Sequence, residues 1–304
     1  MDRMTRKRFC LFLTLPVALT LAGFAAPEEA IEFIQLTDTH VTVQDGVKPD
    51  LVEARKHFAG SGKALAEFFA DGARAFRPSF FLFTGDLVDV YGLAAANGGM
   101  INRQVEAFIR ATAGSPAPVY LALGNHDIQQ YHGAPNGKLV WDQSIAGEAR
   151  AKWIAQAPCF RTGTYYTFER RAGRTTYRFI VLDNGYPTMA AEQLDWLRKE
   201  AGRQGDRALI VAMHIPLGQD ASSHSIKAAL AAARVQLVLA GHQHTNGVDE
   251  LALEGGAAVQ VRTAAFGYGA DNWRRVRLLE DRIEVFTTGA PEKLERTVRV
   301  RAAQ

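Results

Sequence analysis

The stretch "LALGNHDIQQ", Leu121–Gln130, joins an apolar run directly to an amide, an imidazole and a carboxylate. The apolar part belongs to a short run, residues 119–123, whose composition is typical of a buried strand. The run stops at Gly-Asn-His-Asp, residues 124–127, whose polar side chains are able to bind a metal ion or move a proton. The stretch therefore predicts a buried strand that ends in functional groups.

Four other apolar runs end in the same way. They are followed by Asp38 and His40, by Asp86 and Asp89, by His214, and by His242 and His244. Ligands gather at the carboxyl ends of strands in α/β sheets, so the five ends are expected to form one cluster. If the chain is extended at Asp38 and His40, their two-residue spacing points both side chains the same way. Glycines stand directly before Asp86, Asn125 and His242, and glycine permits close backbone approach in a crowded site.

Helices are predicted between these strands, which indicates an α/β fold with covered sheet faces. The predicted helical segments are residues 51–76, 100–113, 142–156 and 190–201. Residues 164–170 and 175–183 have the pattern of a hairpin. After His244 the chain contains several short strand patterns, which predict a second, largely antiparallel sheet. No linker composition separates the two halves, so we expect one domain with two packed sheets.

The polar strand ends have the composition of a metal site. Five of the eight histidines lie there, at His40, His126, His214, His242 and His244. A packing role for all five is disfavoured, whereas the other three, His57, His132 and His224, are expected to be structural. Imidazole, carboxylate and amide ligands without thiolate favour Mn, Fe, Zn or Co over structural zinc. The ligands are too many for one ion, so two divalent or mixed-valence ions are expected.

The first 26 residues differ from the rest of the chain. Residues 1–26 begin with a basic segment, continue with "CLFLTLPVALTLAGF" and end in small residues, which is typical of a secretory signal peptide. "TRKRF" is similar to a twin-arginine signal with Lys7 in place of the second arginine. We expect cleavage near Ala25 or Ala26, a periplasmic or secreted protein, and no stable membrane association afterwards. The functional domain then spans residues 27–304.

Charge and cysteine content change when that segment is set aside. Residues 1–26 contain four of the 35 Lys and Arg residues and one of the 32 Asp and Glu residues, so the remaining chain has no formal net charge. A neutral chain without a basic stripe disfavours nucleic-acid binding. Cys159 becomes the lone cysteine, so no intramolecular disulfide is expected. We expect its thiol to pack as a small hydrophobe.

In their order and spacing the five motifs resemble the calcineurin-like metallophosphoesterase superfamily. The matching residues are Asp38-x-His40, Gly85-Asp86-x-x-Asp89, Gly124-Asn125-His126-Asp127, His214, and Gly241-His242-x-His244. The motifs span residues 38–244, and all five in order make a specific signal. The resemblance implies a four-layer α/β/β/α sandwich of two mixed β-sheets flanked by helices, with a dinuclear metal site at the strand ends.

The resemblance also implies roles for individual residues. One metal would bind Asp38, His40, Asp86 and His244, and the other Asp86, Asn125, His214 and His242. Asp86 would bridge the two ions, because a carboxylate has two oxygens to offer. His126 is left over and is the candidate general acid. Either Asp89 or Asp127 would hold its distal nitrogen and raise its pKa; in members that resemble protein phosphatases, the position of Asp89 has that role.

The activity implied is hydrolysis of phosphomonoesters or phosphodiesters of small molecules by metal-activated hydroxide. The alternative from a different class of function is a non-catalytic metal- or anion-binding module on the same fold. A cyclic-nucleotide phosphodiesterase is a narrower hypothesis for the enzyme activity, although bacterial phosphodiesterases of this kind usually have Arg where Ile128 stands. A nuclease is disfavoured by the absence of net positive charge.

The longest insertion between the motifs runs from Ile128 to Pro158. It leaves from the predicted site, so we expect it to form one wall of a substrate pocket. For its two tryptophans, Trp141 and Trp153, packing against the domain is favoured over substrate contact. Stacking of a nucleobase on Tyr131, or on Tyr268 in a second wall, is a further hypothesis.

Overall fold

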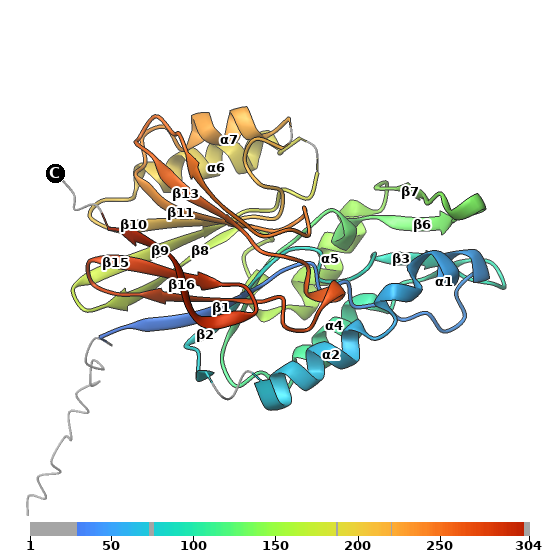
Figure 1. Cartoon of the computed structure of the whole chain (residues 1–304). Coiled ribbons are helices and arrows are strands. Elements are labelled where there is room, and N and C mark those ends of the chain that lie inside the picture. The colour runs from blue at the N-terminus through green and yellow to red at the C-terminus, as the bar shows by residue number, and fades with distance from the viewer. Residues whose placement is uncertain (1–28, 73–75, 187, 220, 301–304) are drawn as a thin grey trace, which may run out of the picture.

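The computed structural model describes residues 29–300 except 73–75, 187 and 220, and the predicted signal peptide lies outside the described residues. Two six-stranded sheets pack against each other, helices cover their outer faces, and a small four-stranded sheet extends from one end of the sandwich (Figure 1). This arrangement confirms the predicted α/β fold of two mixed sheets flanked by helices.

The first sheet has the strand order β16-β15-β14-β1-β2-β5. Its parallel strands are β1 (Ile31–Leu36), β2 (Phe80–Thr84) and β5 (Val119–Ala122), and its antiparallel strands are β14 (Arg274–Leu278), β15 (Arg282–Thr287) and β16 (Ala290–Arg299). The three parallel strands all end in motif residues. Their carboxyl ends therefore meet at one edge of this sheet.

The second sheet has the order β12-β13-β11-β10-β9-β8. Its parallel strands are β9 (Thr175–Val181), β10 (Ala208–Ala212), β11 (Val235–Ala240) and β13 (Ala258–Arg262), and its antiparallel edge strands are β8 (Tyr166–Ala172) and β12 (Gly247–Leu251). The antiparallel pairing of β8 with β9 confirms the predicted hairpin.

The prediction of a second, largely antiparallel sheet after His244 is wrong. Strands β12 and β13 extend the second sheet, whereas β14, β15 and β16 complete the first. Without them, β1 and β11 would each present an unpaired edge of backbone amides and carbonyls. The C-terminal strands pair with these edges, and such long-range pairing leaves no trace in local sequence periodicity.

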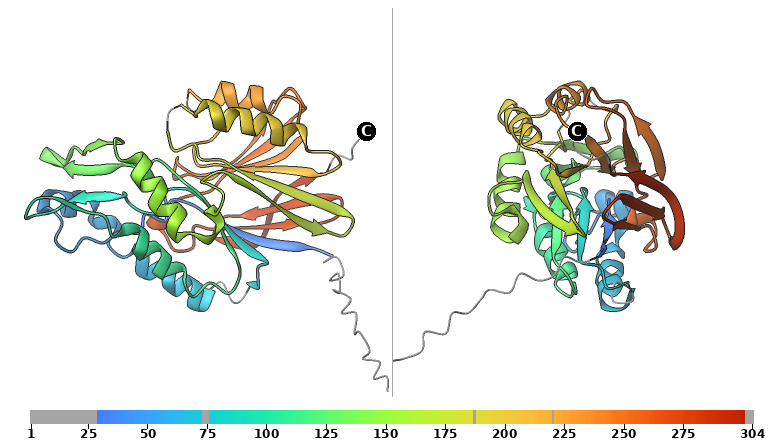
Figure 2. Two further views of the ribbon diagram at one scale, coloured as in Figure 1. Left: turned by 180° about the vertical axis from the view of Figure 1, so that it is seen from behind. Right: turned by 90° about the vertical axis from the view of Figure 1, so that its left-hand side faces the viewer.

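Helices lie outside both sheets (Figure 2). Those beside the first sheet are α2 (Ser61–Glu67), α4 (Gln104–Thr112) and α5 (Ala146–Gln156), and those beside the second are α6 (Ala191–Gly202) and α7 (Ser223–Ala229). The segment predicted as one helical stretch, residues 51–76, is instead broken into α1 (Pro49–Arg55), η1 (Lys56–Phe58), α2 and η2 (Phe68–Gly72). Within the described part of the chain, no helix has the length and apolar character needed to cross a bilayer.

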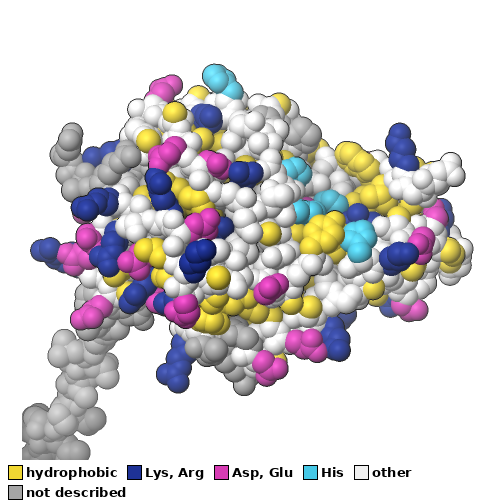
Figure 3. Space-filling model, viewed as in Figure 1, with side chains coloured by type: hydrophobic (Ala, Val, Ile, Leu, Met, Phe, Trp, Pro, Cys, Tyr) yellow, Lys and Arg dark blue, Asp and Glu magenta, His cyan; other side chains and the backbone are white. Residues whose placement is uncertain are grey.

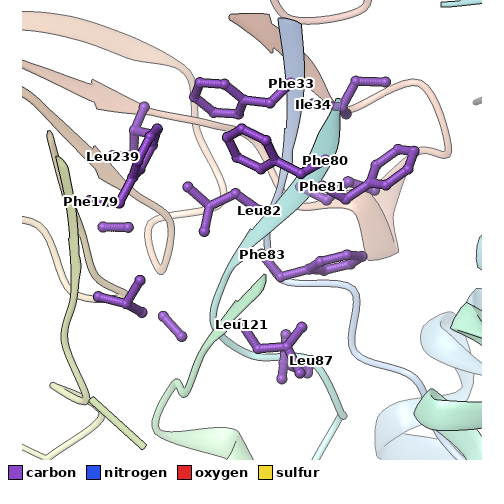
Figure 4. Close-up of a cluster of buried hydrophobic side chains, with 14 of the residues drawn as sticks. Phe33, Ile34, Phe80, Phe81, Leu82, Phe83, Leu87, Leu121, Phe179 and Leu239 are labelled. Carbon is purple, nitrogen blue, oxygen red and sulfur yellow. The ribbon is translucent and has the colours of Figure 1, made fainter. Parts of the chain in front are cut away.

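Aromatic residues fill the space between the two sheets (Figure 4). Phe33 of β1 stacks on Phe80 of β2 with ring centroids 4.7 Å apart, and Phe179 of β9 meets both rings edge-on. These side chains are fully buried, and each buried aromatic contributes about 2 kcal/mol or more to folding. The packed interior holds the two sheets in a fixed relation, and with them the strand ends that carry the motifs.

A third sheet, not predicted from the sequence, has the order β4-β3-β6-β7. Its strands are β3 (Gly92–Ala94), β4 (Met100–Ile101), β6 (Gln130–Gly133) and β7 (Val140–Asp142). Strands of two to four residues are too short to show a two-residue period. The predicted insertion supplies β6, β7 and α5, so the helix expected within it is confirmed.

Candidate metal centre

The five motif-bearing strand ends converge where the two sheets meet. Strands β1, β2 and β5 come from the first sheet, and β10 and β11 come from the second. The loops after them bring together all seven predicted ligands, namely Asp38, His40, Asp86, Asn125, His214, His242 and His244. In Figure 3, histidine side chains gather at one place on the face shown, next to hydrophobic side chains. The remaining histidines, His57, His132 and His224, stand outside these groups.

Asp38, His40, Asp86 and His244 form the first group of candidate ligand atoms. His244 Nε2 lies 3.1 Å from Asp38 Oδ1 and 3.2 Å from His40 Nε2. Asp38 Oδ1 is buried and accepts no hydrogen bond from any described residue. A buried carboxylate oxygen is costly unless it is hydrogen-bonded or coordinates a metal. The group therefore fits a cation.

Asp86, Asn125, His214 and His242 form the second group. His214 Nε2 lies 3.2 Å from Asp86 Oδ2, 3.1 Å from Asn125 Oδ1 and 3.2 Å from His242 Nδ1. His214 Nδ1 lies 2.8 Å from the carbonyl oxygen of Thr84. Since that carbonyl can only accept, Nδ1 carries a proton and Nε2 is the nitrogen that faces the group, the arrangement found in metal-binding histidines.

Asp86 belongs to both groups, although not through its two oxygens as expected. Oδ2 faces the histidines of both groups, 3.2 Å from His214 Nε2 and 4.0 Å from His40 Nε2. Oδ1 instead accepts the backbone N–H of His126 at 3.0 Å. The second oxygen thus anchors the loop after β5, and Oδ2 alone stands between the two groups.

The electrostatics of the centre favour added positive charge. Burial acts to raise the pKa of Asp86, but the neighbouring His214, His126 and His40 outweigh it, so the pKa lies well below its usual value. Burial acts to lower the pKa of His214, yet Asp86 and Asp38 raise it to about 9. Without an ion, a proton on His214 supplies the charge that the buried carboxylates require. A bound metal would supply the same charge and leave the imidazole neutral.

The backbone at most of these ligands is left-handed rather than extended. Seven non-glycine residues of the described chain have a positive φ, and five of them are candidate ligands: Asp38, His40, Asp86, His242 and His244. Such a conformation costs a side-chain-bearing residue about 1 kcal/mol or more, and it clusters at functional sites. Sharp turns, and not strand alternation, therefore place Asp38 and His40 in one ligand group and send His242 and His244 to different groups.

All three glycines that precede motif residues are required by close packing. A Cβ on Gly85, whose φ is positive, would meet the ring of His214. A Cβ on Gly124 would meet the carboxylate and backbone nitrogen of Asp86, and a Cβ on Gly241 would meet Thr37 and the Asp38 carboxylate. The expectation that glycine permits close backbone approach is confirmed at all three positions.

His126 belongs to neither of these two groups, although it forms a further set of possible ligand atoms with His40 and Asp89. Its Nδ1 lies 2.5 Å from the backbone carbonyl oxygen of Asp89 and 3.0 Å from the hydroxyl of Tyr131. Its Nε2 lies 3.9 Å from Asp86 Oδ2, and the side chain is 17% exposed. Because the carbonyl can only accept, Nδ1 carries a proton. Nε2 is the nitrogen left to face the centre.

The expectation that a carboxylate of Asp89 or Asp127 holds the distal nitrogen of His126 is wrong in this structure. The Asp89 carboxylate pairs with Arg55, whose Nε donates at 2.9 Å and whose Nη2 donates as well. The Asp127 carboxylate accepts the backbone N–H groups of Gly124 at 2.7 Å and Val88 at 3.0 Å. Both carboxylates are thus occupied with holding the surrounding loops.

Arg55 and Tyr131 lie at the site although the sequence does not indicate a role there for either of them. Arg55 has the pattern of a charged residue on an amphipathic helix, and its buried partner is 34 positions away. Tyr131 was considered only for stacking, yet it is 2% exposed and its hydroxyl contacts His126. No local signal marks either residue, because their roles depend on contacts between distant elements.

A cleft of about 550 Å³ opens from the second ligand group. Asn125, His126 and His242 line its inner end. Residues of the insertion, Tyr131, Leu139, Trp141 and Gln143 among them, line one wall, as expected. The loops that follow β9 and β10 also line the cleft, through Gly185, Ile215, Gln219 and Ala221. The cleft therefore connects the candidate metal centre with solvent.

The aromatic residues near the centre differ in exposure. Trp153 is fully buried and its Nε1 donates to the carbonyl of Asp127 at 3.1 Å, so the packing prediction holds for it. Trp141 is 55% exposed in the cleft wall, so the same prediction is wrong for this residue. Tyr131 is too buried to stack on a ligand. Tyr268 is 58% exposed and lies parallel to His57, with ring centroids 5.7 Å apart.

The family model described as calcineurin-like phosphoesterase matches residues 31–246. The match covers most of the chain, which therefore belongs to the calcineurin-like phosphoesterase family. This membership confirms the predicted class of enzyme, a metal-dependent phosphoric ester hydrolase. A search of the curated proteins finds no match for the chain.

Solved structures show the same fold at low identity. A dimetal phosphatase from Danio rerio is 13% identical, with a TM-score of 0.60 over 90% of this chain and 99% of that one. GAP50, the anchor in the inner membrane complex of Plasmodium, is 12% identical, with a TM-score of 0.56 over 91% and 90%. Purple acid phosphatase PPD1 from yellow lupin (Lupinus luteus) seeds is 14% identical, with a TM-score of 0.56 over 90% and 54%. At this identity the likeness concerns the fold alone.

Proposed function

We propose that the two ligand groups hold two metal ions and that the site hydrolyses phosphate esters of small molecules. The observation that supports this most is the convergence of two sets of imidazole and oxygen donors on one oxygen, Asp86 Oδ2. This donor chemistry fits Mn, Fe, Zn or Co. When bound, a pair of such ions supplies Lewis acidity, which polarises the phosphoryl oxygens and makes a nucleophile available from water at neutral pH.

The chain's own contribution is to position the phosphate and to protonate the leaving group. His126 is the group proposed to donate that proton, from Nε2 to the departing oxygen. Its Nδ1 is tied to the Asp89 carbonyl and the Tyr131 hydroxyl, so the ring cannot turn away from the centre. Its backbone N–H is held by Asp86 Oδ1. Such positioned acids typically contribute about 10²–10⁴ in rate.

The decisive experiment is reconstitution of residues 27–304 with Mn, Fe, Co or Zn, followed by assays on p-nitrophenyl phosphate and bis-p-nitrophenyl phosphate. We expect two ions per chain and turnover of at least one ester. Two bound ions with no turnover under any metal would favour the non-catalytic module. That alternative is worth the test because a protein described as an anchor has a similar fold. The ratio of the two rates would separate monoester from diester preference.

We also propose that the protein is exported to the periplasm or the medium. The support is the basic, apolar and small-residue order within residues 1–26. N-terminal sequencing of the protein recovered outside the cytoplasm should begin near residue 27. Recovery of a chain that still begins at Met1 would refute the proposal.

A further inference from the structure

The cleft beside the second ligand group continues well beyond the atoms that a phosphate would contact. At about 550 Å³ it is within the size range of small-molecule sites. Asn125 and His242, which belong to the second ligand group, line its inner end together with His126, the proposed proton donor. A phosphate held at the centre would therefore direct one of its ester groups into this cleft.

The wall of the cleft is nearly neutral. Among its described lining residues, Arg55 alone carries a permanent charge, and its guanidinium already pairs with the buried Asp89 carboxylate. No Asp, Glu or Lys side chain is among the described residues that line the cleft. A second phosphate or another charged group would find no free counter-ion among these described residues, so they suit an uncharged group.

Trp141 is the prominent side chain of this wall. It stands opposite Tyr131 in the β6–β7 ladder, so the two side chains lie on the same face of the small sheet. Tyr131 is buried against His126, whereas Trp141, one strand further out, leaves more than half of its surface uncovered. An exposed tryptophan on the face that holds the proposed acid provides a flat apolar surface directed into the cleft.

A hydrogen-bonding group accompanies this surface. Gln143 also lines the cleft, and its side-chain amide makes no hydrogen bond to any described residue. Its backbone carbonyl, by contrast, accepts the hydroxyl of Tyr186 at 2.8 Å, which fixes the backbone at this position. A free amide can both donate and accept. The cleft therefore combines a stacking surface with a free polar contact.

We propose that this cleft binds a planar, uncharged heteroaromatic group of the ester, such as a nucleoside base, stacked on Trp141. The proposal rests on the proposed function, because the phosphate at the metal centre brings that group into place. It names a class of substrate: phosphate esters of nucleoside-like alcohols are preferred over esters of small aliphatic alcohols and over pyrophosphate.

The test compares metal-loaded wild type with Trp141→Ala, Trp141→Phe and the control Val140→Ala. Val140 is the neighbouring residue, 47% exposed, and does not line the cleft. The substrates are adenosine 5′-monophosphate and glycerol 2-phosphate. We expect Trp141→Ala to raise KM for the nucleotide on the order of 10-fold, since stacking on an aromatic side chain is worth about 1–3 kcal/mol. In Trp141→Ala, KM for glycerol 2-phosphate should stay unchanged. In Val140→Ala, KM should stay unchanged for both substrates. Trp141→Phe should restore most of the affinity for the nucleotide.

A binding measurement separates this proposal from the proposed function. Zinc-loaded His126→Ala protein is titrated with adenosine 5′-monophosphate, and tryptophan fluorescence should fall only when Trp141 is present. If wild type hydrolyses no ester, the proposed function fails, and the fluorescence result still decides whether the cleft binds the base. If both esters are hydrolysed with equal KM and no quenching occurs, the cleft proposal fails while the enzyme activity stands. An equal rise in KM for both esters in Trp141→Ala would also overturn the cleft proposal.

Discussion

At the scale of single residues, Asp86 makes the contacts on which most of the site depends. Its Oδ2 faces both ligand groups and its Oδ1 holds the backbone of His126. One side chain thus links the two candidate ions to the loop that carries the proposed acid. The contacts of Asp86, more than the local sequence, determine where the residues around it lie.

Replacing Asp86 with Ala should therefore empty both metal sites. We expect the bound metal, measured by atomic absorption after dialysis, to fall from two ions per chain to fewer than one. Asp45→Ala is the control, because its carboxylate is 92% exposed and forms only a surface pair with Arg103. Stoichiometric metal in Asp86→Ala would contradict the bridging role.

Replacing His126 with Ala should leave both ions in place and slow the chemical step. The loss in kcat should reach about 10²–10⁴ for esters with poor leaving groups and be much smaller for p-nitrophenyl esters, whose leaving group needs little protonation. His224→Ala, an exposed histidine on α7, is the matched control. Loss of a metal ion from His126→Ala would show that this imidazole is a ligand instead.

Tyr131→Phe removes one of the two oxygens beside His126 Nδ1 and keeps the buried ring. Loss of one hydrogen bond is worth about 0.5–1.5 kcal/mol, so kcat should fall roughly 2- to 10-fold with little change in metal content. Tyr120→Phe serves as the control, because its hydroxyl contacts Arg170 instead. An unchanged kcat for poor leaving groups would mean that the Asp89 carbonyl positions His126 without help.

At the scale of elements, the site consists of five turns rather than five strands. The strands bring the chain to one edge, but left-handed residues after β1, β2 and β11 aim five of the seven ligands. The same periodic pattern that predicts a strand says nothing about the conformation of the three or four residues that follow it. The carboxyl ends of the strands were thus predictable, whereas the turn geometry was not.

Gly124→Ala tests the close approach of the loops after β2 and β5. The new Cβ would collide with Asp86, so the loops must separate and the ligand geometry must change. We expect a loss of bound metal and a lower melting temperature. Gly114→Ala is the matched control, since a Cβ there has open space within 4 Å. Full metal occupancy in Gly124→Ala would show that the loops can give way at little cost.

At the scale of the whole molecule, the two sheets are joined by an apolar interior and by the shared ligand set. Asp38, His40, Asp86 and Asn125 follow strands of the first sheet, and His214, His242 and His244 follow strands of the second. Both ligand groups therefore draw side chains from both sheets. Bound metal would tie the two sheets together at the edge where their carboxylates and imidazoles crowd.

Removal of metal should accordingly lower global stability. Each ion present at 100 times its Kd adds about 2.7 kcal/mol, so two ions should raise the melting temperature on the order of 10 °C. Calorimetry with and without chelator measures the shift. Asp86→Ala should show almost no dependence on metal, and an equally large shift in that variant would place the stabilising ions elsewhere.

The sequence by itself determined the α/β class, the five strand ends and the residues that meet there. Buried strands and amphipathic helices leave periodic apolar patterns, and Asp, Asn and His at the ends of such runs are recognisable by their chemistry. The helix within the insertion and the hairpin of β8 and β9 were predicted for the same local reason.

Only the tertiary structure decided which atoms face one another. His126 Nδ1 has two partners, the Asp89 backbone carbonyl and the Tyr131 hydroxyl. The Asp89 carboxylate pairs with Arg55. The C-terminal strands divide between the two large sheets. Each of these contacts joins groups whose meeting depends on the packing of whole elements. Local periodicity records whether a residue is buried, but the partner of a buried polar group is set by the packing that brings distant segments together.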